Sequence, residues 1–180
     1  MRKLNMTELQ RLTVEEFKAA EKLPVIVILD NIRSQNNIGS VFRTADAFRL
    51  QGVFLCGITA TPPHREIQKT ALGATESVEW QYFTSTIEAL LLLKSRGYTI
   101  LAIEQAEGST MLPDFFPTSN EKLAIVFGNE VNGIDNAALN HVSGCIEIPQ
   151  FGTKHSINVS VAVGIVIWDL FCKINYFKNK

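Results

Sequence analysis

The sequence predicts a single α/β domain with a mostly parallel β-sheet flanked by helices. Short β-branched segments alternate along the chain with helical segments, which is the order typical of parallel sheets. One of them, LAIVF at 123–127, is apolar throughout, as expected for a strand covered on both faces. The chain has 180 residues, of which 46% are hydrophobic. That is enough for one compact core and too few for a second domain of ordinary size.

The predicted elements follow in chain order. An N-terminal helix is expected over 7–22, where Thr13 and Glu16 have the spacing of a capping box and Pro24 follows the helix end. The stretch 105–120 contains one Gly and two Pro and is expected to be irregular. The predicted strands cover 25–29, 53–56, 78–83, 98–103, 123–127 and 145–148. The predicted helices cover 37–50, 66–72, 85–95 and 158–174.

Charge and cysteine content limit the possible functions. Lys and Arg number 17 against 18 Asp and Glu, so the chain lacks the positive field of a protein that holds a long polyanion by charge alone. Cys56, Cys145 and Cys172 lie far apart, mostly in apolar runs, which favours buried thiols over disulfides or a metal site. No signal peptide and no membrane-spanning stretch is recognised. We therefore expect a cytoplasmic protein without bound metal.

The segment at 29–48 runs from the end of a strand into a helix that carries one notable arginine. Arg43 has small neighbours in helical register, so its guanidinium is free to reach a phosphate or a carboxylate. A surface salt bridge is the alternative interpretation. The residues expected on the buried face are Ile38, Val41, Phe42, Ala45 and Phe48, and those on the other face are Gly39, Ser40, Arg43 and Ala47.

The segment at 123–135 places two glycines and a carboxylate directly after a buried strand. Gly128 allows close approach of the backbone to a ligand, and Gly133 permits a tight turn into the next helix. Glu130 is the candidate reactive group. Its alternative role is to accept hydrogen bonds from backbone amides at the start of a helix.

The segment at 146–170 leads into a long and almost wholly apolar helix. Ser156 and Asn158 both precede it, although capping accounts for only one of them. Ser156, Ser160 and Gly164 repeat every four residues and form a strip narrow enough for another backbone to approach. Since one small domain cannot bury so much apolar surface, we expect a second subunit to cover part of this helix in a homodimer.

These three segments together resemble the SpoU/TrmH RNA methyltransferases of the knotted SPOUT superfamily, over roughly 25–171. The resemblance rests on three motifs in family order: N-x-G-x-x-x-R at 37–43, F-G-x-E-x-x-G at 127–133 and I-P-x-x-G-x-x-x-S-I-N-V-S at 148–160. IQKTALGA at 67–74 is also similar to a family stretch. Ile157 stands where leucine is usual, and Gln150 with Phe151 replaces a pair that more commonly contains methionine.

The resemblance implies a C-terminal deep trefoil knot, one of the rare exceptions to unthreaded chains. It also implies S-adenosylmethionine (SAM) as the cofactor, held mainly through backbone groups of the knot loops. The implied cofactor-binding residues are Ile103, Gly128, Ile148 and Ile157. The implied catalytic residues are Asn37, Arg43, Glu130, Ser156 and Asn158.

The activity implied by the resemblance is methyl transfer to a ribose 2′-hydroxyl of tRNA or rRNA. Because a guanidinium stays protonated in proteins, we assign Arg43 to stabilising the developing alkoxide and the adjacent phosphate. Ser156 and Asn158 would position the ribose or hold Arg43, and Glu130 would fix the knot loop or pair with Arg43. Base methylation and a non-catalytic RNA-binding module remain alternatives. An ordinary Rossmann-like binder is disfavoured, because no G-x-G-x-x-G follows a predicted strand.

The expected organisation is an N-terminal helical extension at 1–23, a methyltransferase domain at 24–174 and a C-terminal tail at 175–180. The short extension before the first strand favours tRNA over rRNA. The extension itself is expected to pack on the domain or on the second subunit. The tail has basic and aromatic residues that suit RNA binding, although a frayed terminus is the favoured interpretation.

Overall fold

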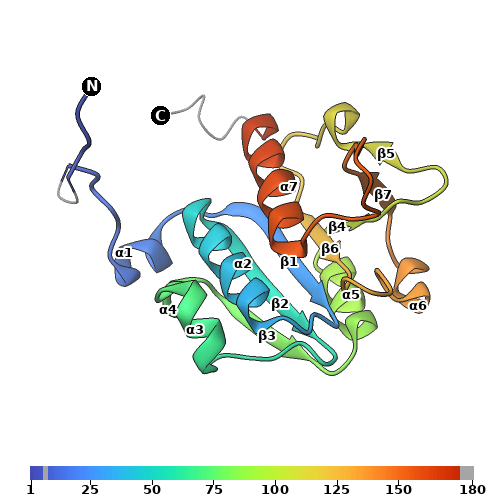
Figure 1. Cartoon of the computed structure of the whole chain (residues 1–180), viewed down its shortest axis with the longest axis horizontal. Helices are drawn as coiled ribbons and strands as arrows, with labels where there is room; N and C mark the ends of the chain where they lie inside the picture. Colours follow the sequence, from blue (N-terminus) through green and yellow to red (C-terminus); the bar gives the residue numbers. More distant parts are fainter. Residues whose placement is uncertain (6–7, 175–180) are drawn as a thin grey trace.

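The computed structural model describes residues 1–5 and 8–174 and shows a seven-stranded sheet in which every pairing is parallel. The strands lie in the order β3-β2-β1-β6-β4-β7-β5, which confirms the predicted fold class (Figure 1). Their bounds are β1 Leu23–Asp30, β2 Leu50–Cys56, β3 Trp80–Phe83, β4 Thr99–Ile103, β5 Thr110–Met111, β6 Leu123–Phe127 and β7 Gly144–Glu147.

Helices cover both faces of the sheet and bury a separate core on each. Along β1, Val25, Val27 and Leu29 belong to the larger core, which includes residues of α2 and α7, whereas Ile26 and Ile28 belong to the core beneath α5. Figure 1 shows α2 and α7 side by side over the sheet. The helices are α1 Val14–Ala19, α2 Gln35–Ala47, α3 Arg65–Ala71, α4 Ala74–Ser77, α5 Thr86–Ser95, α6 Asn136–Leu139 and α7 Val159–Lys173, with a 3₁₀ helix η1 at Leu112–Asp114.

The N-terminal helix is much shorter than the predicted 7–22, and that prediction was wrong. The capping box of Thr13 and Glu16 is present, but it starts α1 and nothing helical precedes it among the described residues. Leu9 and Leu12 are exposed, so the first half of the predicted helix has no core to pack against. Thr7 lies outside the described residues.

The end of α2 also differs from the predicted span of 37–50. Ser34 caps the helix through the amide of Asn37, and the helix ends before Arg49, whose φ of 48° turns the chain into β2. Leu50 then pairs with Leu23 of β1. At the C-terminal end of α2, pairing of Leu50 in the sheet therefore outweighs the helical pattern of the sequence.

Most other boundaries fall within two residues of those predicted. The elements that were not predicted are short. The helices α4 and α6 have four residues each and were not predicted. Strand β5 lies inside the stretch expected to be irregular, where it pairs with β7 at the sheet edge. Lys173, at the end of α7, donates to the carbonyl of Leu112 at 2.6 Å and thereby ties the last helix to η1.

Gly39 lies on the buried side of α2, not on the exposed side with Arg43 as predicted. A Cβ at Gly39 would lie 2.1 Å from Thr70 Oγ1 and 2.3 Å from the carbonyl oxygen of Ile67. Only glycine lets α2 and α3 come this close. Within residues 1–5 and 8–174, none of the helices combines the length and apolar character needed to cross a bilayer.

Candidate active site

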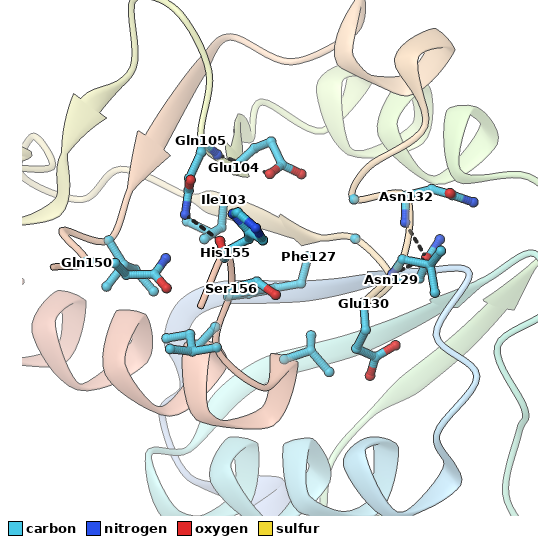
Figure 2. A pocket seen from close by; sticks show the side chains of 17 residues that line it. Ile103, Glu104, Gln105, Phe127, Asn129, Glu130, Asn132, Gln150, His155 and Ser156 are labelled. Carbon is cyan, nitrogen blue, oxygen red and sulfur yellow. Dashed lines mark hydrogen bonds between the residues drawn. The ribbon is translucent and has the colours of Figure 1, made fainter. Parts of the chain in front are cut away.

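The main candidate site is a cavity of about 370 Å³ at the C-terminal ends of β4, β6 and β7. Its walls are the segment 103–105 after β4, the loop 127–133 after β6, and residues 148–157 between β7 and α7, with the start of α7 as its floor (Figure 2). Open parallel sheets bind ligands at this edge, because loops leave the strands there with their backbone groups unpaired.

The loop after β6 is closed by its own hydrogen bonds. Asn129 forms a bridge with Gly133, and Asn129 Oδ1 accepts from the amides of Val131 and Asn132 at 2.9 Å each. Gly133 has a φ of 67°, which confirms the predicted tight turn. A Cβ at Gly128 would lie 2.1 Å from the backbone of Gly133. The close approach at Gly128 is thus made by the loop's own turn and not, as predicted, by a ligand.

Three side chains from the three sequence motifs meet beside this cavity. Asn37 Nδ2, at the start of α2, donates to Glu130 Oε1 at 2.8 Å, and Asn158 Nδ2 donates to Asn37 Oδ1 at 3.2 Å. Asn158 is also the N-cap of α7, where its Oδ1 accepts from the amide of Ser160 at 2.9 Å. Each amide is fixed in orientation, because one of its ends bonds to a defined partner.

The remaining residues expected at the site divide into two groups. Ser156 and the four expected cofactor-binding residues, Ile103, Gly128, Ile148 and Ile157, all line the cavity. Arg43 does not line it. Arg43 is exposed on α2 in a separate shallow hollow that also includes Lys69 and Phe48.

Glu130 is bonded to Asn37, and the ion pairs found within the described chain do not join it to Arg43. Ser156 and Asn158 likewise make no hydrogen bond to Arg43 in that part of the chain. Glu130 therefore ties the loop after β6 to α2, and the Arg43 guanidinium makes no ion pair within the described residues.

Two carboxylates that hold the site together were missed in the sequence. Asp30, which is buried at the end of β1, accepts from Thr86 Oγ1 at 2.5 Å and from the amide of Asp135 at 2.9 Å, so it ties α5 to the end of the cavity loop. Glu104, directly after β4, accepts from the amide of Ile134 at 3.2 Å. The available signal was an acidic residue directly after an apolar strand in both LPVIVILD and TILAIE.

Cys145, in β7, lies next to the backbone of Glu104. Its thiol donates to the carbonyl of Glu104 at 3.3 Å, and burial raises the pKa of this thiol. It packs against the core beneath α5 as a partly buried side chain. Cys145 therefore serves the structure of the β4–β7 edge and is not a reactive thiol of the cavity.

Comparison with known proteins assigns the architecture and these motifs to one family. Residues 24–168 match the SpoU rRNA Methylase family. The chain belongs to this family. The match includes all three motif segments, so the cluster of Asn37, Glu130 and Asn158 lies within the SpoU part of the chain.

Relatives of this SpoU chain include bacterial RNA methyltransferases. It is 31% identical over 167 residues to a Staphylococcus saprophyticus protein assigned to the TrmH family tRNA/rRNA methyltransferases, covering 93% of this chain and 66% of the relative. It is 33% identical over 144 residues to the 23S rRNA (guanosine-2′-O-)-methyltransferase RlmB of Neisseria meningitidis, covering 80% of this chain and 56% of that protein. The chain thus spans less than two thirds of the length of these relatives.

The fold is shared with solved structures of the family. An AdoMet-bound rRNA methyltransferase from Sinorhizobium meliloti superposes with a TM-score of 0.77 at 24% identity, over 86% of this chain and 59% of that one. This SpoU fold implies the trefoil knot predicted for the C-terminal part of the chain. In this chain the segment that leads into α7 is held where Gln105 Nε2 donates to the carbonyl of His155 at 3.0 Å.

Proposed function

We propose that this chain is a SAM-dependent methyltransferase that acts on a ribose 2′-hydroxyl of tRNA or rRNA. The observation that carries the proposal is the hydrogen-bonded cluster of Asn37, Glu130 and Asn158 beside the cavity. These side chains come from three motifs that are far apart in sequence. Family membership and the 2′-O-methyltransferase named among the relatives support the ribose over the base.

The cavity suits SAM in size and lining. A volume of about 370 Å³ falls in the range typical of small-ligand sites. Ile103, Ile148 and Ile157 supply apolar walls, while the 127–133 loop supplies backbone groups. Bound SAM supplies a methyl group that the sulfonium has already activated. The chain's own task is to hold the cofactor and the acceptor hydroxyl in line, which contributes up to ~7–11 kcal/mol in well-oriented pairs.

The acceptor hydroxyl must lose a proton as the new bond forms. We assign the stabilisation of the developing alkoxide and the neighbouring phosphate to Arg43, whose guanidinium is exposed and makes no ion pair within the described chain. Asn37 and Asn158 position the ribose from the cluster. The proton leaves to phosphate or water.

A homodimer through α7 completes this arrangement. Val161, Ile165 and Trp168 are 51%, 39% and 56% exposed and follow one side of α7, so they leave an apolar face of the kind that a second subunit covers. Phe48 contacts Trp168, with ring centroids 6.0 Å apart, and belongs to the same hollow as Arg43. Pairing two copies through this face brings Arg43 to the subunit boundary, where it meets RNA bound at the partner's cavity.

The proposed dimer face differs from the Ser156, Ser160 and Gly164 strip predicted from sequence. Beyond its chain neighbours and the backbone of its own helix, nothing among the described residues lies within 4 Å of a Cβ built at Gly164. The exposed side chains that need cover are those of Val161, Ile165 and Trp168. We keep the predicted homodimer and shift the centre of its interface by one residue around the helix.

The proposal is tested by binding followed by product analysis. Calorimetry should show that purified protein binds SAM and that S-adenosylhomocysteine (SAH) displaces it. RNA methylated by the protein, digested to nucleosides and resolved by mass spectrometry, should contain 2′-O-methyl nucleosides. No heat at millimolar SAM would refute a methyltransferase, and a base-methylated nucleoside would refute ribose as the acceptor.

The target RNA and the cellular setting belong to the same proposal. We assign 24–174 to the methyltransferase unit, 1–23 to an N-terminal extension and 175–180 to a tail whose residues lie outside the described part of the chain. We place the protein in the cytoplasm, where its three free cysteines stay reduced. Mapping ribose methylation across tRNA and rRNA of a strain that lacks the protein identifies the substrate, and we expect the lost site in tRNA.

A further inference from the structure

The cavity proposed to hold SAM carries an uncompensated negative charge. All residues lining it are described, and its only titratable side chains are Glu104, Glu130 and His155, with no lysine or arginine among them. The carboxylate of Glu130 bonds to the neutral amide of Asn37. Charge in such a cavity acts over several ångströms, because the protein interior screens it far less than water does.

The Glu104 carboxylate is fixed in this cavity. Its Oε2 accepts from the amide of Ile134 at 3.2 Å and its Oε1 accepts from the amide of Gln105 at 3.1 Å. Both donors are neutral, so they orient the side chain without cancelling its charge. The backbone amide of Glu104 is held as well, by the carbonyl of Ile146 of β7 at 3.2 Å. Figure 2 shows Glu104 pointing from the end of β4 toward the loop that carries Asn129 and Asn132.

We propose that Glu104 makes the cavity discriminate the cationic methyl donor from its neutral product. This inference rests on the proposed function. SAM carries one net positive charge, from its sulfonium, and SAH carries none. On transfer, the acceptor oxygen forms a bond to the methyl carbon, the carbon–sulfur bond breaks and sulfur keeps the electron pair. The hydroxyl proton then leaves with the positive charge, so the attraction between Glu104 and the cofactor falls when the product forms.

The same attraction has a predictable kinetic signature. A carboxylate that stabilises the full positive charge of bound SAM stabilises a transition state with less of that charge by a smaller amount. Removing it should therefore raise the KM for SAM without lowering the rate of methyl transfer at saturating SAM. Removing a side chain that served only to hold the loop would raise the KM for SAM and lower the rate of methyl transfer together.

The test compares three ligands on matched variants. Glu104→Gln removes the charge and keeps an acceptor for the Ile134 amide, while Glu107→Gln removes an exposed carboxylate of the same segment that does not line the cavity. Affinities are measured by calorimetry for SAM, for SAH and for sinefungin, which carries a protonated amine where SAM has its sulfonium methyl. In Glu104→Gln the preference for SAM over SAH should fall about three- to tenfold. The affinity for sinefungin should fall along with the affinity for SAM. Glu107→Gln should leave that preference unchanged.

A second variant keeps the inference testable if Glu104→Gln does not fold. Gln150 lines another wall and makes no hydrogen bond within the described chain, so Gln150→Lys adds a positive charge without disturbing Glu104. Like Glu104→Gln, Gln150→Lys should lower the preference for SAM over SAH. An equal loss of affinity for all three ligands, or an unchanged preference for SAM over SAH in both variants, overturns the inference. If the wild type binds none of the ligands, the proposed function fails instead.

Discussion

Asn37 and Glu130 are 93 residues apart in the chain, yet Asn37 Nδ2 donates to Glu130 Oε1 at 2.8 Å. The bond joins the start of α2 to the loop after β6. The other end of the Asn37 amide accepts from Asn158 at 3.2 Å, so a single side chain links the loop to the N-cap of α7. This geometry fixes which atom of Asn37 donates and which accepts.

Replacing Asn37 with Asp should therefore slow the proposed methyl transfer more than replacing it with Ala. An aspartate cannot donate to Glu130, and two facing carboxylates repel until one of them takes a proton. We expect methyl transfer by Asn37→Asp to be slower than by Asn37→Ala, because alanine removes the bond without placing a second carboxylate beside Glu130. Single-turnover rates of the two variants and of wild type provide the measurement. Equal rates for Asn37→Asp and Asn37→Ala would contradict the assigned bond.

Arg43 is expected to act on the RNA and not on the cofactor, since it lies outside the cavity. Arg43→Ala should lower single-turnover methyl transfer by ~10²-fold or more, the scale seen when one transition-state donor is lost. The dissociation constant for SAM should stay near the wild-type value. Arg43→Lys should restore little, because a point charge does not reproduce the planar fork of donors. A loss of SAM affinity in proportion to the loss of rate would show instead that Arg43 serves the cofactor site.

The exposed face of α7 should control the oligomeric state. Val161 on α7 and Leu91 on α5 are 51% and 50% exposed, so they form a matched pair on opposite faces of the sheet. Wild type should sediment at micromolar concentration with about twice the 20.0 kDa mass of the chain. Val161→Glu should sediment as a monomer, and Leu91→Glu should behave as wild type. A wild-type monomer, or a dimer that survives Val161→Glu, would remove α7 from the interface.

Two glycines in helices should respond oppositely to alanine. Gly39→Ala puts a Cβ 2.1 Å from Thr70 Oγ1 between α2 and α3, and should lower the free energy of unfolding by about 1–3 kcal/mol. Gly164→Ala adds a methyl group with no neighbour within 4 Å in the described chain, and should raise it by about 0.5–1 kcal/mol. Urea unfolding of both variants tests this. If Gly164→Ala weakens the dimer, the partner's backbone packs at Gly164, as the strip of Ser156, Ser160 and Gly164 predicts.

Cys56 and Cys172 should differ in reactivity, because their environments differ. Burial raises the pKa of the Cys56 thiol to about 12, so at pH 8 its thiolate fraction is on the order of 10⁻⁴ and only unfolding should expose it to a thiol reagent. Cys172 is exposed on α7, so the predicted buried thiol is wrong at this position, and it should react readily in a monomer. Mass spectrometry of alkylated peptides should show faster labelling of Cys172 in Val161→Glu than in wild type. Equal rates would argue against cover of this part of α7.

The sequence by itself determined the fold class and the positions of most elements. These features depend on short-range physics. Alternating and continuous apolar runs define strands, and side-chain caps define helix starts, as Thr13, Ser85 and Asn158 do here. The motifs also carried the candidate site residues, because the residue types and spacings of the family are visible without coordinates.

Only the tertiary structure decided which of these residues meet. The order of the strands brings the ends of β1, β4, β6 and β7 together, and no local pattern specifies that order. Hence the bond between Asn37 and Glu130, the separation of Arg43 from the cavity and the bond from the Ile134 amide to Glu104 were not visible in the sequence. The predicted span of the N-terminal helix was wrong for the same reason. Leu9 and Leu12 have the periodicity of a helix, but no core buries them. Periodicity indicates which residues of a segment could be buried together, but whether they are buried depends on the tertiary packing around them.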